Sequence, residues 1–265
     1  MKILVMVKQV AALDEDFEFC ADGKDVEPGF LVRDLNEWDD FSLEEAVSIK
    51  EHGNEVEVVA LTVGPAAADE ILRKCLAKGA DRAVRVWSNA AVGSDSIAIA
   101  RVLAAAARRE RPDIIFAGVQ SSDHGFASTG VAVAGILGWP YAAVVSQLSY
   151  TPGATRAAFR RELEGGMLQA MEIDIPAVLT IQLGINAPRY ASLRSIKQAA
   201  AKSIEVLSLE EIGLASSDVG ETGSRSRVRR MYAPPKGRAE MIEGSIAEQA
   251  ARLATLIKDF KGGAA

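Results

Sequence analysis

The first 140 residues alternate short apolar runs with segments of helical spacing. The runs are apolar throughout, which is typical of strands buried on both faces of a sheet. Predicted strands cover residues 2–8, 55–62, 83–87 and 113–117, and predicted helices cover residues 42–53, 66–78, 94–109 and 129–137. The first helix is assigned from the capping-box pattern that begins at Ser42. This alternation predicts an α/β fold with a doubly wound parallel sheet.

The pattern changes after residue 140. Residues 142–150, 156–163 and 167–182 have strand character without intervening helices, so we expect an antiparallel addition at the sheet edge. Residues 184–238 are rich in turn formers and lack a clear period, which predicts an extended arm. The predicted division is therefore an α/β domain at 1–183, a loop and arm at 184–238, and a C-terminal helix at 239–265.

The C-terminal helix has an apolar stripe. Its members follow one another at intervals of three or four residues: Ile242, Ile246, Ala250, Leu253, Ile257 and Phe260. Such a stripe needs a surface to pack against. From the pattern alone, packing on its own domain and packing on a second subunit are equally well supported.

Candidate binding residues follow three of the predicted strands. In a doubly wound sheet, ligands bind beyond the carboxyl ends of the strands. The segments that begin at Lys8, Val63 and Gly118 lie there. Glycine permits close backbone approach, and a helix N-terminus favours phosphate. The pattern is compatible with an adenine-nucleotide site, although the chain has neither a GxGxxG nor a GxxxxGK[ST] motif.

Composition excludes several classes of function. The two cysteines and two histidines have no metal-ligand or disulfide-framework spacing, so we expect no metal site. A net charge of −6 argues against nucleic-acid binding. No apolar run is long enough to span a membrane, and the first eight residues are too short for a signal peptide, so we expect a cytoplasmic protein. No nucleophile stands in a recognisable catalytic setting, which predicts a protein that is not itself an enzyme.

Five stretches resemble segments of electron transfer flavoprotein β subunits. They are residues 36–46 (NEWDDFSLEEA), 75–82 (CLAKGADR), 161–166 (RELEGG), 176–180 (PAVLT) and 188–193 (PRYASL). Their combination is specific, and the similarity extends over nearly the whole chain. DLNEWDDFSLEEA, GVQSSD and SRVRRMY are most similar to the methylotrophic-bacterial branch, in which the electron donor is trimethylamine dehydrogenase.

The resemblance implies an adenine-nucleotide-binding-like domain that holds AMP, in a heterodimer with a larger α subunit that carries most of the FAD site. The heterodimer would carry electrons from a flavin dehydrogenase to a quinone oxidoreductase. The implied AMP contacts are Met6, Asn36, Glu37, Trp38, Asp39, Val63, Gly118, Val119, Gln120, Ser121, Ser122, Asp123 and Thr129. Leu13 and Trp38 would lie near FAD.

The resemblance also implies a docking site for the donor. Leu193 would insert into a donor pocket, beside Tyr190 and within a rim formed by Arg189, Arg194 and Lys197. Glu162 would pair with an arginine of the α subunit or of the flavin domain.

Two other functions stay open at this point. A stand-alone ATP-binding stress or signalling module accounts for the first 140 residues but leaves the arm without a purpose. A bifurcating electron transfer flavoprotein would hold a second FAD in place of AMP. In that branch the loop after the fourth strand usually has the sequence Asp-Gly-Asp-Thr, whereas residues 123–126 here are DHGF, which favours AMP.

Overall fold

A computed structural model describes residues 1–13, 16–53, 55–235, 237 and 241–262. The chain forms two compact units, Met1–Arg230 and Met231–Ala265. The strands are β1 (Lys2–Met6), β2 (Gln9–Leu13), β3 (Leu31–Leu35), β4 (Glu57–Val63), β5 (Arg82–Val86), β6 (Ile114–Gly118), β7 (Tyr141–Ser149), β8 (Arg156–Glu162), β9 (Leu168–Asp174), β10 (Ala177–Ile181) and β11 (Glu205–Leu207). The α-helices are α1 (Glu37–His52), α2 (Asp69–Lys78), α3 (Ser96–Glu110), α4 (Thr129–Leu137), α5 (Leu193–Ala201), α6 (Gly220–Gly223) and α7 (Ile246–Gly262).

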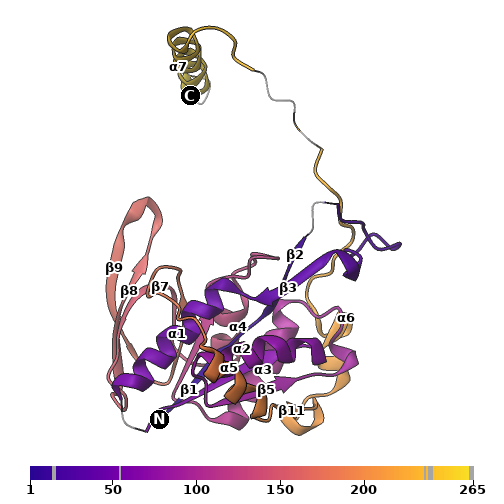
Figure 1. Cartoon of the computed structure of the whole chain (residues 1–265), viewed down its shortest axis with the longest axis vertical. Helices are drawn as coiled ribbons and strands as arrows, with labels where there is room; N and C mark the ends of the chain where they lie inside the picture. Colours follow the sequence, from indigo (N-terminus) through magenta and orange to yellow (C-terminus); the bar gives the residue numbers. More distant parts are fainter. Residues whose placement is uncertain (14–15, 54, 236, 238–240, 263–265) are drawn as a thin grey trace. The chain divides into compact units, whose positions relative to one another are not determined.

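The first unit is built on a mostly parallel sheet, shown in Figure 1. Within the described residues it has nine strands in the order β11-β5-β4-β1-β6-β10-β7-β8-β9. Strand β1 lies between β4 and β6 and is parallel to both. The chain proceeds outward from β1 through β4 and β5, then crosses to β6 on the other side. The switch point of the sheet is therefore between β1 and β6.

Helices cover both faces of this sheet, which confirms the doubly wound prediction. Ile3 and Val5 pack in one core with the buried side chains of α1 and α2. Leu4, between them, belongs to a second core with α3 and α4. Successive side chains of a strand point to opposite faces, so β1 must be apolar at every position.

The antiparallel addition is smaller than the sequence analysis predicts. The stretch 167–182 is interrupted at Ile175–Pro176 and forms two strands, β9 and β10. Strands β7, β8 and β9 pair antiparallel, as expected. Strand β10 instead runs parallel between β6 and β7, inside the sheet, and its five residues are all buried. A strand inside the sheet is covered on both faces, which explains why the sequence of β10 is almost continuously apolar.

The first helix begins earlier than the capping-box pattern indicates. Helix α1 starts at Glu37, after Asn36. The Ser42 hydroxyl is inside the helix and donates to the carbonyl of Trp38 at 2.9 Å, so it caps nothing. The structure also contains an antiparallel hairpin, β2–β3, that the hydrophobic pattern does not predict.

Much of the segment after residue 183 belongs to the first unit. Helix α5 packs against α2, and β11 pairs parallel with β5 at the edge of the sheet. This placement differs from the predicted boundary at residue 183, because α5 and β11 are too short to produce a clear hydrophobic period. In the second unit, α7 carries the predicted apolar stripe from Ile246 onward, whereas Ile242 lies before the start of the helix.

Candidate functional site

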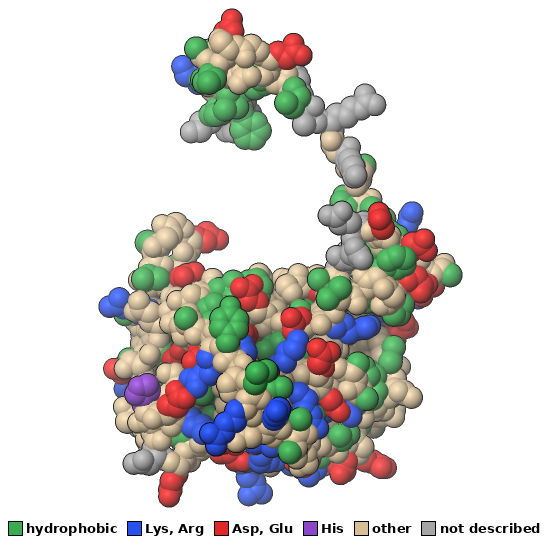
Figure 2. Space-filling view, in the orientation of Figure 1, with side chains coloured by type: hydrophobic (Ala, Val, Ile, Leu, Met, Phe, Trp, Pro, Cys, Tyr) green, Lys and Arg blue, Asp and Glu red, His purple; other side chains and the backbone are tan. Residues whose placement is uncertain are grey.

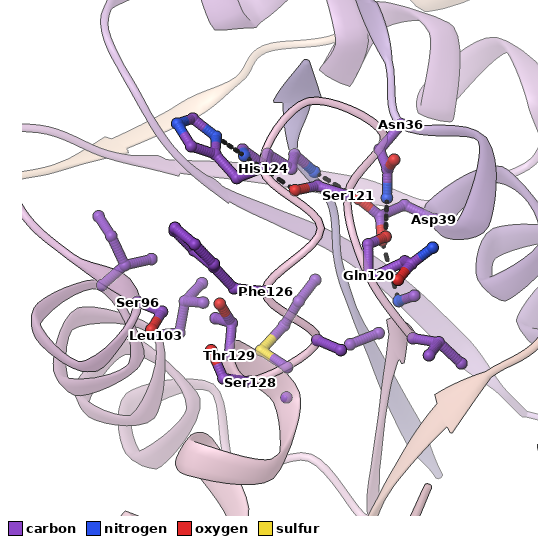
Figure 3. A pocket seen from close by; sticks show the side chains of 18 of the residues that line it. Asn36, Asp39, Ser96, Leu103, Gln120, Ser121, His124, Phe126, Ser128 and Thr129 are labelled. Atoms are coloured by element: carbon purple, nitrogen blue, oxygen red, sulfur yellow. Dashed lines mark hydrogen bonds between the residues drawn. The ribbon is translucent and has the colours of Figure 1, made fainter. Parts of the chain in front are cut away.

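A cavity of about 330 Å³ opens at the switch point of the sheet. It lies beyond the carboxyl ends of β1, β4 and β6, where the sequence analysis expects a ligand. Nine of the predicted AMP contacts line it: Met6, Asn36, Asp39, Val63, Gly118, Val119, Gln120, Ser121 and Thr129. Figure 3 shows Asn36 and Asp39 on one side and Ser96 and Leu103 of α3 on the other. The predicted contacts absent from its lining are Glu37, Trp38, Ser122 and Asp123.

Asp39 joins the ends of the two central strands. One carboxylate oxygen accepts from the backbone N–H of Lys8 at 2.7 Å, just after β1. The other accepts from the N–H of Gly118 at 2.9 Å, the last residue of β6. Burial raises the pKa of Asp39 to about 7, against the opposing effect of these two donors. Asp39 therefore fixes the floor of the cavity and is itself only 5% exposed.

We expect Asp39→Asn to destabilise the fold by about 1–3 kcal/mol. The amide of asparagine has one acceptor oxygen, so its NH₂ group would face the N–H of either Lys8 or Gly118 and leave that donor without an acceptor. The raised pKa of Asp39 adds wild-type stability at low pH, and this stability is lost as pH rises from the unfolded value of about 3.9 through the folded value of about 7. The destabilisation caused by Asp39→Asn should thus be about 2–3 kcal/mol smaller at pH 8 than at pH 5. Urea unfolding at both pH values measures it. A difference that grows with pH would contradict the assignment.

The side chain of Lys8 bonds to three residues of the loop after β6, at the rim of the cavity. Its ammonium contacts Asp123 at 2.6 Å, Ser121 at 3.1 Å and the His124 ring nitrogen at 3.2 Å. Burial acts to raise the pKa of Asp123, but bonds from His124, Lys8 and Ser121 outweigh it and hold the pKa well below its usual range. Asp123 is thus ionised at neutral pH and holds the loop to Lys8 without lining the cavity itself.

The N-termini of α3 and α4 both lie at the cavity, but only the N-terminus of α3 is capped by a charged side chain. At α3, the Asp95 side chain accepts from the N–H groups of Ile97 and Ala98, so that end is already capped by an anion. Bonds from backbone N–H groups overcome the effect of burial and lower the pKa of Asp95 to about 2. At α4, Ser128 makes no side-chain cap. Its buried hydroxyl has no hydrogen-bond partner among the described residues. An anion is therefore best placed at α4.

Close packing requires glycine at two positions of this site. A Cβ on Gly118 would lie 2.5 Å from a carboxylate oxygen of Asp39, and a Cβ on Gly130 would lie 2.7 Å from the Thr180 side chain. Gly118 was predicted from sequence to be a ligand contact. The second reason for glycine there is the close approach of α1 to the end of β6.

Several lining residues were missed by the sequence analysis. They come from the loop before α3, from α3 itself, from the end of the β6–α4 loop and from the start of α4: Ser94, Asp95, Ser96, Ile99, Leu103, Phe126, Ala127, Ser128 and Gly130. Asp95 could have been recognised from the sequence as the N-cap of α3, because an Asp at the start of a helical pattern after a strand is a typical N-cap.

The comparisons with known proteins agree with this geometry. Residues 32–212 match the family model described as the electron transfer flavoprotein domain. The chain is 65% identical to the electron transfer flavoprotein subunit beta of Methylophilus methylotrophus, over 99% of this chain and 100% of that protein. The chain belongs to the electron transfer flavoprotein β subunits.

Other similar proteins come from different lineages. The chain is 34% identical to the mitochondrial electron transfer flavoprotein subunit beta of Arabidopsis thaliana, over 94% of this chain and 95% of that protein. It is 33% identical to the caffeyl-CoA reductase-Etf complex subunit CarD of Acetobacterium woodii, over 98% of each. The β-subunit resemblance proposed from sequence is thereby confirmed.

The β subunit presents the predicted docking residues at its surface. Tyr190 is 98% exposed and Leu193, the first residue of α5, is 81% exposed. Arg189, the first residue of the predicted rim, is partly exposed, and its guanidinium is bonded to Glu44 and Glu51 of α1. Arg194 is exposed, as is Lys197.

The residues predicted near FAD and the α subunit lie on another part of the β subunit. The Trp38 ring N–H donates to Gln182 at 3.2 Å, and the Gln182 amide donates to Glu162 at 3.1 Å. Trp38 does not line the cavity at the switch point, whereas Asn36 and Asp39 do. The side chain of Leu13 lies outside the described residues.

None of the helices described is long and apolar enough to cross a membrane. In the same part of the chain, no three His, Cys, Asp or Glu side chains are grouped so that they could hold a metal ion.

Proposed function

We propose that this chain binds AMP as a structural cofactor in a heterodimeric electron transfer flavoprotein, where it helps to hold FAD. The observation that carries the proposal is the cavity at the switch point, with the unpaired Ser128 hydroxyl at the uncapped end of α4. This end would take the phosphate. Met6, Val63 and Leu103 provide an apolar wall for the base.

The size of the cavity favours AMP over a second FAD. About 330 Å³ is near the lower end of ligand pockets, which run from about 300 to 1,000 Å³. A mononucleotide suits this space, whereas a dinucleotide with a three-ring flavin would need the walls to move apart. A stand-alone ATP-binding module is disfavoured by the family membership and leaves α7 without a role.

The redox chemistry is supplied by FAD when it is bound, and this chain contributes position and surroundings. Trp38 is held by Gln182 and would offer its ring edge as part of the wall near the flavin. No residue of this chain needs to donate or accept a proton in this role. The β subunit would thus act as an electron carrier component and not as an enzyme.

The donor would bind at the exposed segment that carries Tyr190 and Leu193. An apolar anchor among basic side chains suits a transient redox encounter, in which one buried residue gives specificity and charges steer the approach. We propose a flavin dehydrogenase of the trimethylamine dehydrogenase type as donor and a quinone-linked oxidoreductase as acceptor.

Acid extraction tests the nucleotide assignment. The purified heterodimer should release about one AMP per β subunit and one FAD per heterodimer, as separated and counted by chromatography. Two FAD and no AMP would support the bifurcating alternative. A colourless homodimer that releases ATP would support the stand-alone module instead.

Asp123→Ala should weaken the retention of AMP. The variant frees the Lys8 ammonium from its 2.6 Å contact and loosens the loop after β6, with a loss of about 1.5–3 kcal/mol for a charged hydrogen bond. AMP content after prolonged dialysis measures the effect. The control is Asp174→Ala, which breaks a surface ion pair between Asp174 of β9 and Arg156 of β8, away from the cavity. Equal AMP loss from both variants would mean that Asp123 has no specific role.

A further inference from the structure

The segment that presents Tyr190 and Leu193 is fastened at its start by Arg189. The Nε and Nη2 groups of Arg189 donate to the two carboxylate oxygens of Glu44 at 2.9 and 3.0 Å. Nη1 and Nη2 also donate to the two oxygens of Glu51. The backbone N–H of Arg189 donates to Glu44 as well, at 3.1 Å. One guanidinium thus bridges two turns of α1 with paired bonds, an arrangement suited to its planar fork.

Further bonds fix both ends of the segment. Before Arg189, the Asn186 amide donates to the Phe41 carbonyl at 3.1 Å and to Glu45 at 2.9 Å. At the far end, Arg73 of α2 donates to the carbonyls of Ala199 and Lys202, which close the last turn of α5. The chain between residues 186 and 202 is therefore held between α1 and α2.

Between these attachments the apolar side chains face solvent. Tyr190 is 98% exposed, Leu193 81% and Ile196 48%. Side chains this exposed have few contacts of their own, so their position depends largely on the backbone that carries them. A segment ordered before the encounter avoids the entropy cost of ordering during binding.

We propose that Arg189 is a positioning residue that pre-orders the docking segment on α1. This inference rests on the proposed function in one respect, namely that the donor binds at Leu193. Lysine should not replace Arg189, because a single ammonium cannot pair with both carboxylates in the same geometry. Removing the guanidinium also leaves Glu44 and Glu51 without the cation that joins them to the segment.

The test uses the assembled heterodimer. Hydrogen exchange of the peptide covering residues 186–202 reports order, and reduction by trimethylamine dehydrogenase as the probe reports docking. Arg189→Ala should speed exchange in this peptide about tenfold and raise KM for the flavoprotein about tenfold with kcat unchanged. Arg189→Lys keeps the positive charge, but it should still change both the exchange rate and KM by about threefold.

Three further variants separate the possible causes. Leu193→Ala should raise KM without changing exchange. Arg156→Ala removes an arginine that also has two carboxylate partners, Glu172 and Asp174, and should change neither quantity. Glu51→Gln is a milder variant that keeps the Glu44 bonds, and it covers the case in which Arg189→Ala does not assemble.

Each outcome has a defined meaning. If the peptide 186–202 exchanges at the wild-type rate in both Arg189→Ala and Glu51→Gln, the proposal is overturned even if KM rises. The rise in KM would then come from the lost charge and not from lost order in the segment. Faster exchange with unchanged KM also overturns the positioning role. If Leu193→Ala leaves KM unchanged, or trimethylamine dehydrogenase reduces no form of the protein, the proposed docking function has failed, whereas the exchange result still decides whether Arg189 orders the segment.

Discussion

Removal of residues 239–265 should abolish stable association with the α subunit while the sheet unit stays folded. Helix α7 carries a stripe of exposed apolar side chains, among them Ile246, Leu253, Ile257 and Phe260. Figure 2 shows hydrophobic side chains gathered along one side of this helix. If four such side chains are buried against the partner, the loss is about 6 kcal/mol at 1.5 kcal/mol each. That corresponds to more than about 10⁴-fold in affinity.

Co-purification of the two subunits, followed by circular dichroism of the truncated chain, measures both parts of this result. The predicted cut at Ala239 falls outside the described residues, but Met1–Arg230 forms a compact unit without it. Within the full chain, Leu253→Asp should disrupt the heterodimer and the adjacent Arg252→Asp should be tolerated. A normal yield of heterodimer from the truncation would show that α7 does not bind the partner.

Leu193→Ala should weaken the complex with the electron donor about thirtyfold. Loss of a buried apolar group at the centre of a contact costs roughly 2 kcal/mol, and about 1.4 kcal/mol corresponds to a factor of ten. Because Leu193 is 81% exposed in the free protein, the thermal midpoint and the flavin spectrum should not change. Stopped-flow reduction by trimethylamine dehydrogenase, at several flavoprotein concentrations, measures the affinity.

Two controls accompany this measurement. Reduction by dithionite should proceed at the wild-type rate, because it does not use the docking surface. Val92→Ala removes apolar surface from another residue that is 65% exposed and should leave donor binding unchanged. Wild-type kinetics in Leu193→Ala would exclude this residue as the anchor.

The sheet and its cavity could be predicted because they depend on local patterns. The strands that become β1, β4, β5 and β6 are continuous apolar runs, and parallel strands carry their ligands at one edge. The pattern predicts a common site for the segments that begin at Lys8, Val63 and Gly118, and all three residues line the cavity.

The remaining features depend on contacts that no local pattern encodes. The capping-box sequence at Ser42 indicated a helix start, but tertiary contacts extend α1 back to Glu37, where Asp39 bonds to two strand ends. The uncapped state of Ser128 could be recognised only when the residues around it were placed. The inward role of Arg189 was missed because its partners on α1 lie far away in sequence.

The position of β10 has a consequence for synthesis on the ribosome. This strand is among the last parts of the sheet to be translated, yet it lies between β6 and β7. A nascent chain that ends before Ala177 would leave the edges of β6 and β7 unpaired, and unpaired strand edges promote pairing between chains. The sheet therefore cannot grow strand by strand as the chain emerges, and its completion awaits a late insertion into its middle.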